Sequence, residues 1–182
     1  ATYNASWKNI SWDRSWQSNY SKIINVTDTG LLLWMRLNNE SNYGENSTKF
    51  YNFHQGKNNG SCKLSYCPTL VGGKFGKAYN FSDVTNKDSA IMINDSNVFR
   101  IGNRSFSITM WVNHEELSTN SMPVLLLKGN STTGQFYTQY DNRSGWRTLI
   151  FVTLLTNGSQ NHLRSAVNTP KFDNNWHFLS FV

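Results

Sequence analysis

Ser105-Phe-Ser-Ile-Thr-Met-Trp-Val112 decides the fold. Apolar and polar side chains alternate along it without a break: Phe106, Ile108 and Met110 belong to the apolar side, and Trp111 lies among hydroxyl-bearing residues on the other. Because side chains repeat every two residues along a strand, the pattern predicts a half-buried β-strand and not a helix. We interpret it as a central strand of a sandwich, with the rest of the chain covering its apolar face.

Other stretches have strand character and are separated by turns rich in Asn, Gly and Ser. The predicted strands are Gly30–Leu37, Ala78–Ser82, Ala90–Ile93, Pro123–Lys128, Gln135–Tyr140, Arg147–Thr156, His162–Val167 and Trp176–Val182. No stretch has a convincing helical period, so we predict an all-β fold, an antiparallel β-sandwich. With 182 residues in total, we expect one domain over residues 30–182, preceded by an extension over residues 1–29.

The extension has a composition of its own. Trp7, Trp12 and Trp16 recur in a Ser-Trp rhythm whose spacing fits neither a strand nor a long amphipathic helix. One interpretation is that these tryptophans pack against the main domain and hold the extension to it. The other is a segment that docks onto a neighbouring subunit or stacks on sugar rings, since Trp combines a large apolar area with a polar edge. The chain begins at Ala1, and we expect a leader to have been removed.

Asn-x-Ser/Thr sequons are more frequent than chance predicts. The chain holds thirteen, against roughly five expected for its composition. This excess predicts an extracellular chain with dense N-glycosylation, which would also keep a surface with few charges soluble. The predicted attachment sites are Asn4, Asn9, Asn19, Asn25, Asn39, Asn46, Asn59, Asn80, Asn94, Asn103, Asn130, Asn142 and Asn157.

The two cysteines, Cys62 and Cys67, enclose four residues. An even count in an exported chain predicts a disulfide, and closing so short a loop stabilises by only about 2 kcal/mol. A zinc site is disfavoured because no second Cys or His pair lies nearby.

Charge and hydropathy disfavour two classes of partner. The net charge is +6, but the 17 Lys and Arg residues are scattered and form no nucleic-acid-binding motif. The longest apolar run, Thr148–Leu155, is far shorter than the ~18 residues of a membrane span. We therefore expect neither nucleic acid nor a membrane span.

Six motifs occur in this order along the chain: Gly30-Leu-Leu-Leu-Trp-Met-Arg-Leu37, Asn58-Asn-Gly60, Gly73-Lys-Phe-Gly-Lys-Ala-Tyr-Asn-Phe-Ser82, Phe106-Ser-Ile-Thr-Met-Trp-Val112, Val124-Leu-Leu-Leu-Lys-Gly129 and Asn175-Trp-His-Phe-Leu-Ser-Phe-Val182. In sequence and in order they resemble laminin G-like, concanavalin A-like jelly-roll domains of archaeal or bacterial surface proteins. The resemblance implies further C-terminal strands, whereas the sequence stops at Val182. We expect the extension, a neighbouring chain or further residues to complete the sheets.

The resemblance also implies a calcium site at the rim of the sandwich. Asp83 and Asp88 are the candidate ligands, because Ca²⁺ prefers carboxylate and carbonyl oxygens. The alternative is that these residues only form turns. No cofactor is expected to be required.

The sequence gives no support to catalysis. Its four glutamates form no paired pattern of the glycosidase kind, its four histidines lack metalloprotease spacing, and it has no Gly-x-Ser-x-Gly elbow. Exposed aromatics near an amide would instead form a glycan platform; the candidates are Trp111, Tyr137, Tyr140 and Trp146, with ordinary packing as the alternative.

Two functions follow from these observations. The first is a non-catalytic, heavily N-glycosylated extracellular or cell-surface module for adhesion through cell-surface glycans. The alternative is a structural subunit of a glycan-coated extracellular filament or surface layer, in which copies of the chain assemble by strand or tail exchange.

Overall fold

The computed structural model of the chain describes residues 30–63, 66–81, 89–101, 104–115, 122–129, 136–143, 147–154, 159–166 and 173–182. These residues form antiparallel sheets and two 3-10 helices, Ser41–Tyr43 and Asn97–Phe99, and include no α-helix. The prediction of an all-β chain is confirmed. No helix in this part of the chain is long and apolar enough to cross a membrane. Residues 1–29 lie outside the described residues.

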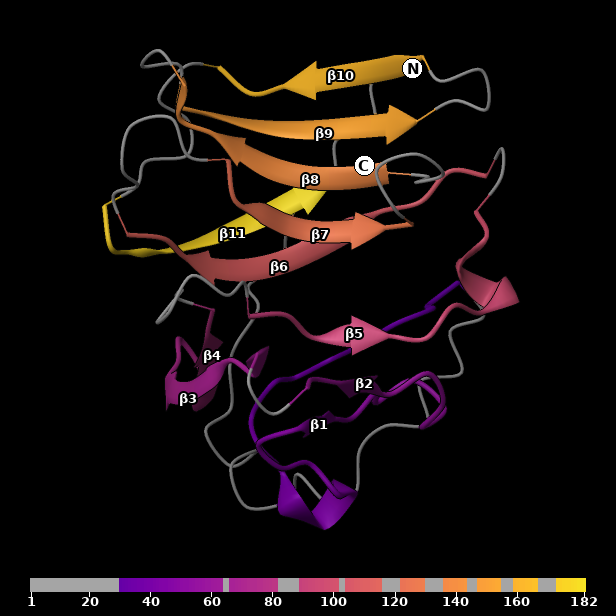
Figure 1. Cartoon of the computed structure of the whole chain (residues 1–182), viewed down its shortest axis with the longest axis vertical. Helices are drawn as coiled ribbons and strands as arrows, with labels where there is room; N and C mark the ends of the chain where they lie inside the picture. Colours follow the sequence, from indigo (N-terminus) through magenta and orange to yellow (C-terminus); the bar gives the residue numbers. More distant parts are fainter. Residues whose placement is uncertain are drawn as a thin grey trace, which may run out of the picture. The chain divides into compact units, whose positions relative to one another are not determined.

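The chain divides into two compact units, Ala1–Arg100 and Ile101–Val182. In the first, strands β1 (Lys49–Phe50), β2 (Gly60–Ser61) and β5 (Met92–Ile93) form a sheet in the order β1-β2-β5. Strands β3 (Thr69–Gly72) and β4 (Lys77–Asn80) form a separate hairpin (Figure 1). The predicted strands Ala78–Ser82 and Ala90–Ile93 are thus confirmed in part, while β1, β2 and β3 were not predicted.

The predicted strand Gly30–Leu37 is not formed. The backbone N–H of Trp34 donates to the side-chain Oδ1 of Asn52 at 2.9 Å, and its carbonyl accepts from the N–H of Phe53 at 2.8 Å. Leu37 then turns the chain with a positive φ of 56°. The segment is therefore anchored at Trp34 partly by a side-chain amide, in place of a regular strand ladder.

The core of the first unit gathers around Phe50, Cys62 and Tyr79, with Met35, Leu37, Cys67 and Ile91 packed against it. The rings of Phe50 and Tyr79 meet edge to face, 4.9 Å between centroids. Cys62 and Cys67 form the predicted disulfide, with their Cα atoms 5.1 Å apart. Because Cys62 is buried, the bridge attaches its short loop directly to the core.

The described residues of the second unit form two sheets. Strand β6 (Ile108–Asn113) pairs with β11 (Trp176–Phe181), and the other sheet has the order β10-β9-β8-β7 (Figure 1). Its strands are β7 (Val124–Lys128), β8 (Phe136–Asp141), β9 (Thr148–Leu154) and β10 (Gln160–Arg164). Each overlaps a predicted strand.

The alternation predicted for the opening stretch is confirmed in β6, where half-buried and exposed residues alternate along the whole strand. Its predicted central position is not shown: among the described residues β6 pairs only with β11. Hydrophobic periodicity reports which face of a strand is buried, but it does not report how many neighbours the strand has.

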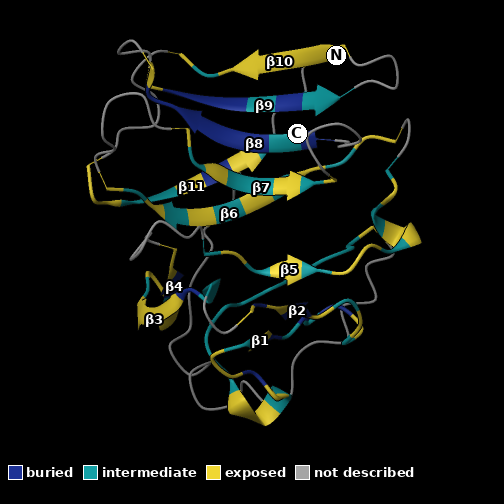
Figure 2. Ribbon diagram, in the orientation of Figure 1, coloured by how far each residue is buried: buried dark blue, intermediate teal, exposed yellow. Residues whose placement is uncertain are grey.

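The inner faces of the two sheets pack together. Tyr140, Leu149 and Leu179 form the buried cluster, and Met110, Val112, Leu125 and Phe181 pack against it. The ring of Phe106 lies 4.9 Å from that of Phe136 and 5.9 Å from that of Phe151. Figure 2 shows β8 and β9 buried along much of their length and β10 exposed. The apolar side of the opening stretch therefore contributes to the core, as predicted.

Candidate functional site

The candidate site is the face of the β6–β11 sheet that points away from this core. Residues alternate between faces along each strand, and the register places Thr109 opposite Ser180, Trp111 opposite Phe178, and Asn113 opposite Trp176. We call these six residues the outer aromatic face. Their chain neighbours Met110, Val112 and Leu179 point the other way, into the core.

Two large aromatic side chains dominate this face. Trp111 is 43% exposed and Phe178 is 55% exposed. Their ring centroids lie 5.4 Å apart with the planes inclined by 53°, a contact that follows from their directly opposite positions on paired strands. The sheet therefore presents a pair of aromatic rings to solvent. Exposed apolar patches of this kind mark interaction surfaces.

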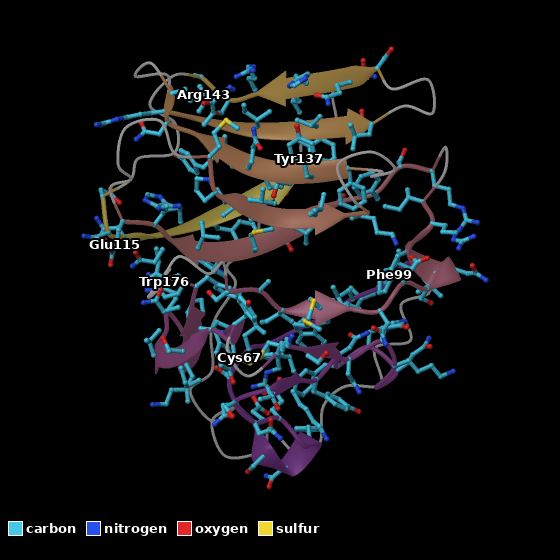
Figure 3. The ribbon with its side chains drawn as sticks, viewed as in Figure 1. Cys67, Phe99, Glu115, Tyr137, Arg143 and Trp176 are labelled. Carbon is cyan, nitrogen blue, oxygen red and sulfur yellow. A yellow bond between two sulfur atoms is a disulfide. The ribbon has the colours of Figure 1, made fainter. Side chains whose placement is uncertain are left out.

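Polar groups flank the aromatic pair. The exposed hydroxyl-bearing residues Thr109 and Ser180 lie on one side of it along the strands. On the other side the Asn113 side-chain amide donates to the carbonyl of Asn174 at 2.9 Å, which fixes its orientation. Trp176, half-buried, begins β11 at this end (Figure 3).

A hydrogen bond between His177 and Asp173 organises the turn before β11. The Nε2 atom of His177 lies 2.9 Å from Oδ1 of Asp173, and that oxygen also accepts the backbone N–H of Asn175. The hydrogen bond from His177 is the main reason that the pKa of Asp173 is lowered from its ordinary value. The ring of His177 therefore contributes a polar contact to the turn that precedes β11.

The structure separates the predicted glycan-binding residues. Trp111 belongs to the outer aromatic face, whereas Tyr140 is 1% exposed in the core, where burial raises the pKa of its hydroxyl. Tyr137 lies three residues before Tyr140 on β8 and so points to the opposite side of that sheet. Trp146 lies outside the described residues. The predicted four-residue platform is therefore wrong, because the side chain of Tyr140 is buried and a glycan cannot contact it.

Sequence reasoning missed Phe178 and Trp176. The alternation within Trp176–Phe181 carried a usable signal, since residues 176, 178 and 180 share a face of any strand formed there. What the sequence did not contain was the pairing with β6, which connects residues distant in the chain and brings Phe178 against Trp111.

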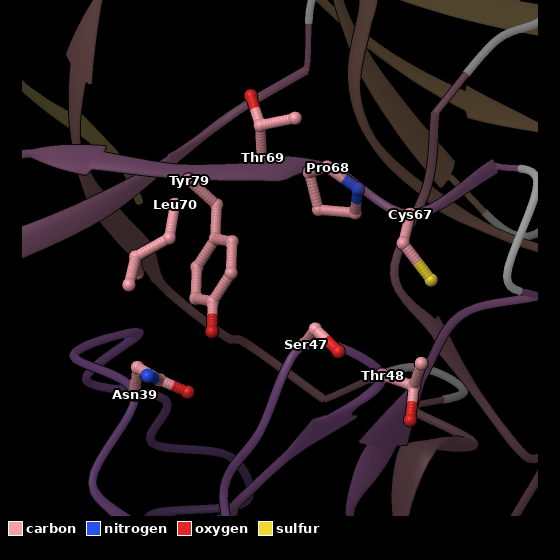
Figure 4. Close-up of a pocket in the computed structure, with 8 residues that line it drawn as sticks. All are labelled: Asn39, Ser47, Thr48, Cys67, Pro68, Thr69, Leu70 and Tyr79. Atoms are coloured by element: carbon pink, nitrogen blue, oxygen red, sulfur yellow. The ribbon is translucent and has the colours of Figure 1, made fainter.

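The first unit has a hollow of about 350 Å³, near the lower end of the ~300–1,000 Å³ typical of small-molecule sites (Figure 4). It is lined by Asn39, Ser47, Thr48, Cys67, Pro68, Thr69, Leu70 and Tyr79. The Tyr79 hydroxyl donates to the carbonyl of Asn46 at 3.5 Å. The pKa of this hydroxyl is raised, mainly by burial and to a smaller extent by the negative charge of Glu45. The lining residues include no carboxylate or imidazole, so the hollow offers polar contacts without an acid–base pair.

The predicted calcium ligands Asp83 and Asp88 lie outside the described residues. Among the residues that are described, no group of three or more His, Cys, Asp or Glu side chains is arranged to hold a metal ion.

The sequons differ in their accessibility. Asn46, Asn59, Asn80 and Asn94 are exposed and Asn39 is half-buried. Asn142 is 6% exposed, and a glycan attached there would have to displace folded structure. The remaining predicted sites, Asn4, Asn9, Asn19, Asn25, Asn103, Asn130 and Asn157, lie outside the described residues.

Comparison with known proteins adds no assignment: no protein family, curated protein sequence or solved structure matches this chain.

Proposed function

We propose that the chain is a non-catalytic extracellular module that binds glycans through the outer aromatic face. The observation that carries the proposal is the exposed Trp111–Phe178 pair flanked by hydroxyls and an oriented amide. A sugar ring has apolar C–H faces that pack on aromatic rings and hydroxyls that exchange hydrogen bonds with such polar neighbours. The open face suits a saccharide chain lying along the surface.

Binding without cleavage is the chemistry that this face supports. Its six residues include no carboxylate, whereas glycoside hydrolysis needs an acid and a second carboxylate on either side of the scissile bond. The two packed antiparallel sheets of the second unit also support the expectation of a jelly-roll domain of the laminin G-like kind, which is part of the proposal.

The Trp111→Ala variant tests the proposal. In a glycan array followed by calorimetry on each retained glycan, we expect it to weaken binding at least about tenfold, the typical loss for a central aromatic anchor. The matched control is Leu127→Ala, which removes a side chain that is 49% exposed on β7 in the other sheet. Equal affinities for the Trp111→Ala variant and the unaltered chain, or an array that retains nothing, would contradict the proposal.

A second function is favoured by one observation, the open edge of β10. All five of its residues are exposed, and among the described residues it pairs only with β9. An edge of this kind accepts a strand from another chain, and repeated donation between copies would produce a filament. The native mass separates the two functions, because a discrete species favours the glycan-binding module and long polymers favour the structural subunit.

A further inference from the structure

A second hollow in the first unit encloses a complete sequon. Its volume is about 340 Å³, and all three residues of Asn59-Gly60-Ser61 line it. The remaining lining residues are Tyr43, Gly44, Lys49, Phe50 and Tyr51. A predicted glycan attachment site therefore lies at the wall of a hollow with aromatic sides.

The side-chain amide of Asn59 is held in a fixed orientation. Its Oδ1 accepts the backbone N–H of Asn52 at 2.8 Å, and its Nδ2 donates to the carbonyl of Gly56 at 3.3 Å. Asn52 itself is buried, 1% exposed, whereas Asn59 is exposed. A glycosylated amide nitrogen keeps one hydrogen, so the bond to Gly56 is compatible with a sugar on the same atom.

Two tyrosines line the same hollow as Asn59. Tyr43 and Tyr51 are half-buried, with ring centroids 5.4 Å apart and planes inclined by 35°. The ring centroid of Phe53 lies 4.8 Å from that of Tyr43 and 5.1 Å from that of Tyr51, so Phe53 packs against both rings. The Tyr51 hydroxyl would lie only 2.5 Å from a Cβ placed on Gly56, the residue whose carbonyl accepts from Asn59. The Tyr51 hydroxyl therefore lies close to Gly56, the residue that holds the Asn59 amide.

We propose that this hollow holds the first pyranose ring of an N-linked glycan on Asn59, with the sugar packed against Tyr43 and Tyr51. The inference rests on the predicted N-glycosylation and is separate from the outer aromatic face. Attachment forms a bond from Asn59 Nδ2 to the anomeric carbon of a polyprenyl-phosphate-linked saccharide. The amide loses one proton, and the lipid phosphate leaves with the anomeric oxygen.

A sugar in this position acts as part of the fold. It covers the partly exposed rings of Tyr43 and Tyr51, which line the hollow beside Phe50 of the core of the first unit. Covering more apolar surface stabilises the folded state, and because the first sugar is tethered, its contact with the tyrosines is favoured by a high effective concentration. The glycan on Asn59 is therefore expected to stabilise the first unit, unlike glycans at exposed sequons that line neither hollow.

The Ser61→Ala variant tests this inference. It removes the hydroxyl that the sequon requires and leaves both hydrogen bonds of Asn59 intact. The matched control is Ser96→Ala, which removes the sequon of exposed Asn94; none of its three residues lines either hollow. With chain from a glycosylating host, we expect peptide mass spectrometry to find Asn59 occupied. We expect Ser61→Ala to lower Tm by about 4 °C, and Ser96→Ala to leave it unchanged.

Nuclear Overhauser effects between protons of the first sugar and the Tyr43 and Tyr51 rings provide the direct readout. Protein from a non-glycosylating host is the control for folding, because without a glycan both variants should have the same Tm as the unaltered chain. A bare Asn59, an occupied Asn59 without these contacts, or capture of a free glycan by the hollow of the bare chain would each overturn the inference. Glycan-array binding through the outer aromatic face should be unchanged by Ser61→Ala, so failure of one proposal is distinguishable from failure of the other.

Discussion

Replacement of Asn52 by alanine is expected to lower the free energy of unfolding of the first unit by about 3–5 kcal/mol. The Asn52 Oδ1 accepts the backbone N–H groups of Trp34 and His54 at 2.9 and 3.0 Å, and its Nδ2 donates to the carbonyl of Lys57 at 2.7 Å. The side chain is almost completely buried. Alanine removes the partner of three backbone groups, of which the His54 bond is buried and the other two are partly buried. A buried group left without a partner costs about 1–3 kcal/mol.

Chemical denaturation followed by hydrogen exchange is the measurement, because exchange assigns the loss to the first unit. Asn97→Ala is the control: Asn97 is exposed in a short 3-10 helix, and its replacement should change stability by no more than about 0.5 kcal/mol. If the Asn52→Ala variant proved as stable as the control, Asn52 would not be what anchors the segment around Trp34.

Asp141→Asn is expected to destabilise the second unit by about 2 kcal/mol at neutral pH. The carboxylate at the end of β8 is 3% exposed and receives two hydrogen bonds from the Arg143 guanidinium, each at 2.9 Å. The Nη1 atom of Arg164 on β10 lies 3.4 Å from Oδ2 of Asp141. The side-chain hydrogen bond from Arg143 is the main reason that the pKa of Asp141 is lowered to about 2. The neutral amide of asparagine keeps the shape of the side chain but loses the charge that both arginines contact.

The loss depends on pH in a defined direction. Because the folded pKa lies below the ordinary value of 3.8, this stabilisation is complete above about pH 5 and declines as the pH falls from there toward 2. The difference in stability between the parent chain and Asp141→Asn should therefore narrow over that interval. Asp95→Asn is the control, since Asp95 and Arg100 form an exposed pair whose contribution is expected to be small. A difference that stayed constant from pH 7 to pH 2 would contradict the assigned role of the charge.

Local patterns predicted the second unit better than the first. The alternation from Phe106 to Val112 correctly predicted the strand and its buried face, and the apolar run in Arg147–Thr156 correctly predicted β9. Gly30–Leu37 has a similar apolar run, but its Trp34 is anchored partly by the side chain of Asn52. Whether an apolar run joins a sheet depends on the partner that its backbone finds, and no pattern within the run encodes that partner.

The candidate site was predictable only in part, for the same reason. Trp111 was identified because it interrupts a row of hydroxyl-bearing residues on its strand. Phe178 became part of the site only through strand pairing. Tyr140 was misassigned because an aromatic residue near turn residues resembles a surface aromatic until its neighbours in the core are known. Asn142 shows the same limit for sequons, since the triplet does not report burial.

The most direct test of the glycan-binding proposal is a nuclear magnetic resonance titration of the isotope-labelled chain with an array-retained glycan. We predict that the indole N–H signals of Trp111 and Trp176 and the backbone amides of β6 and β11 shift with a common dissociation constant. The amides of β10 should not move. Shifts confined to residues away from the outer aromatic face, with the signal of Trp111 unchanged at saturation, would contradict the account.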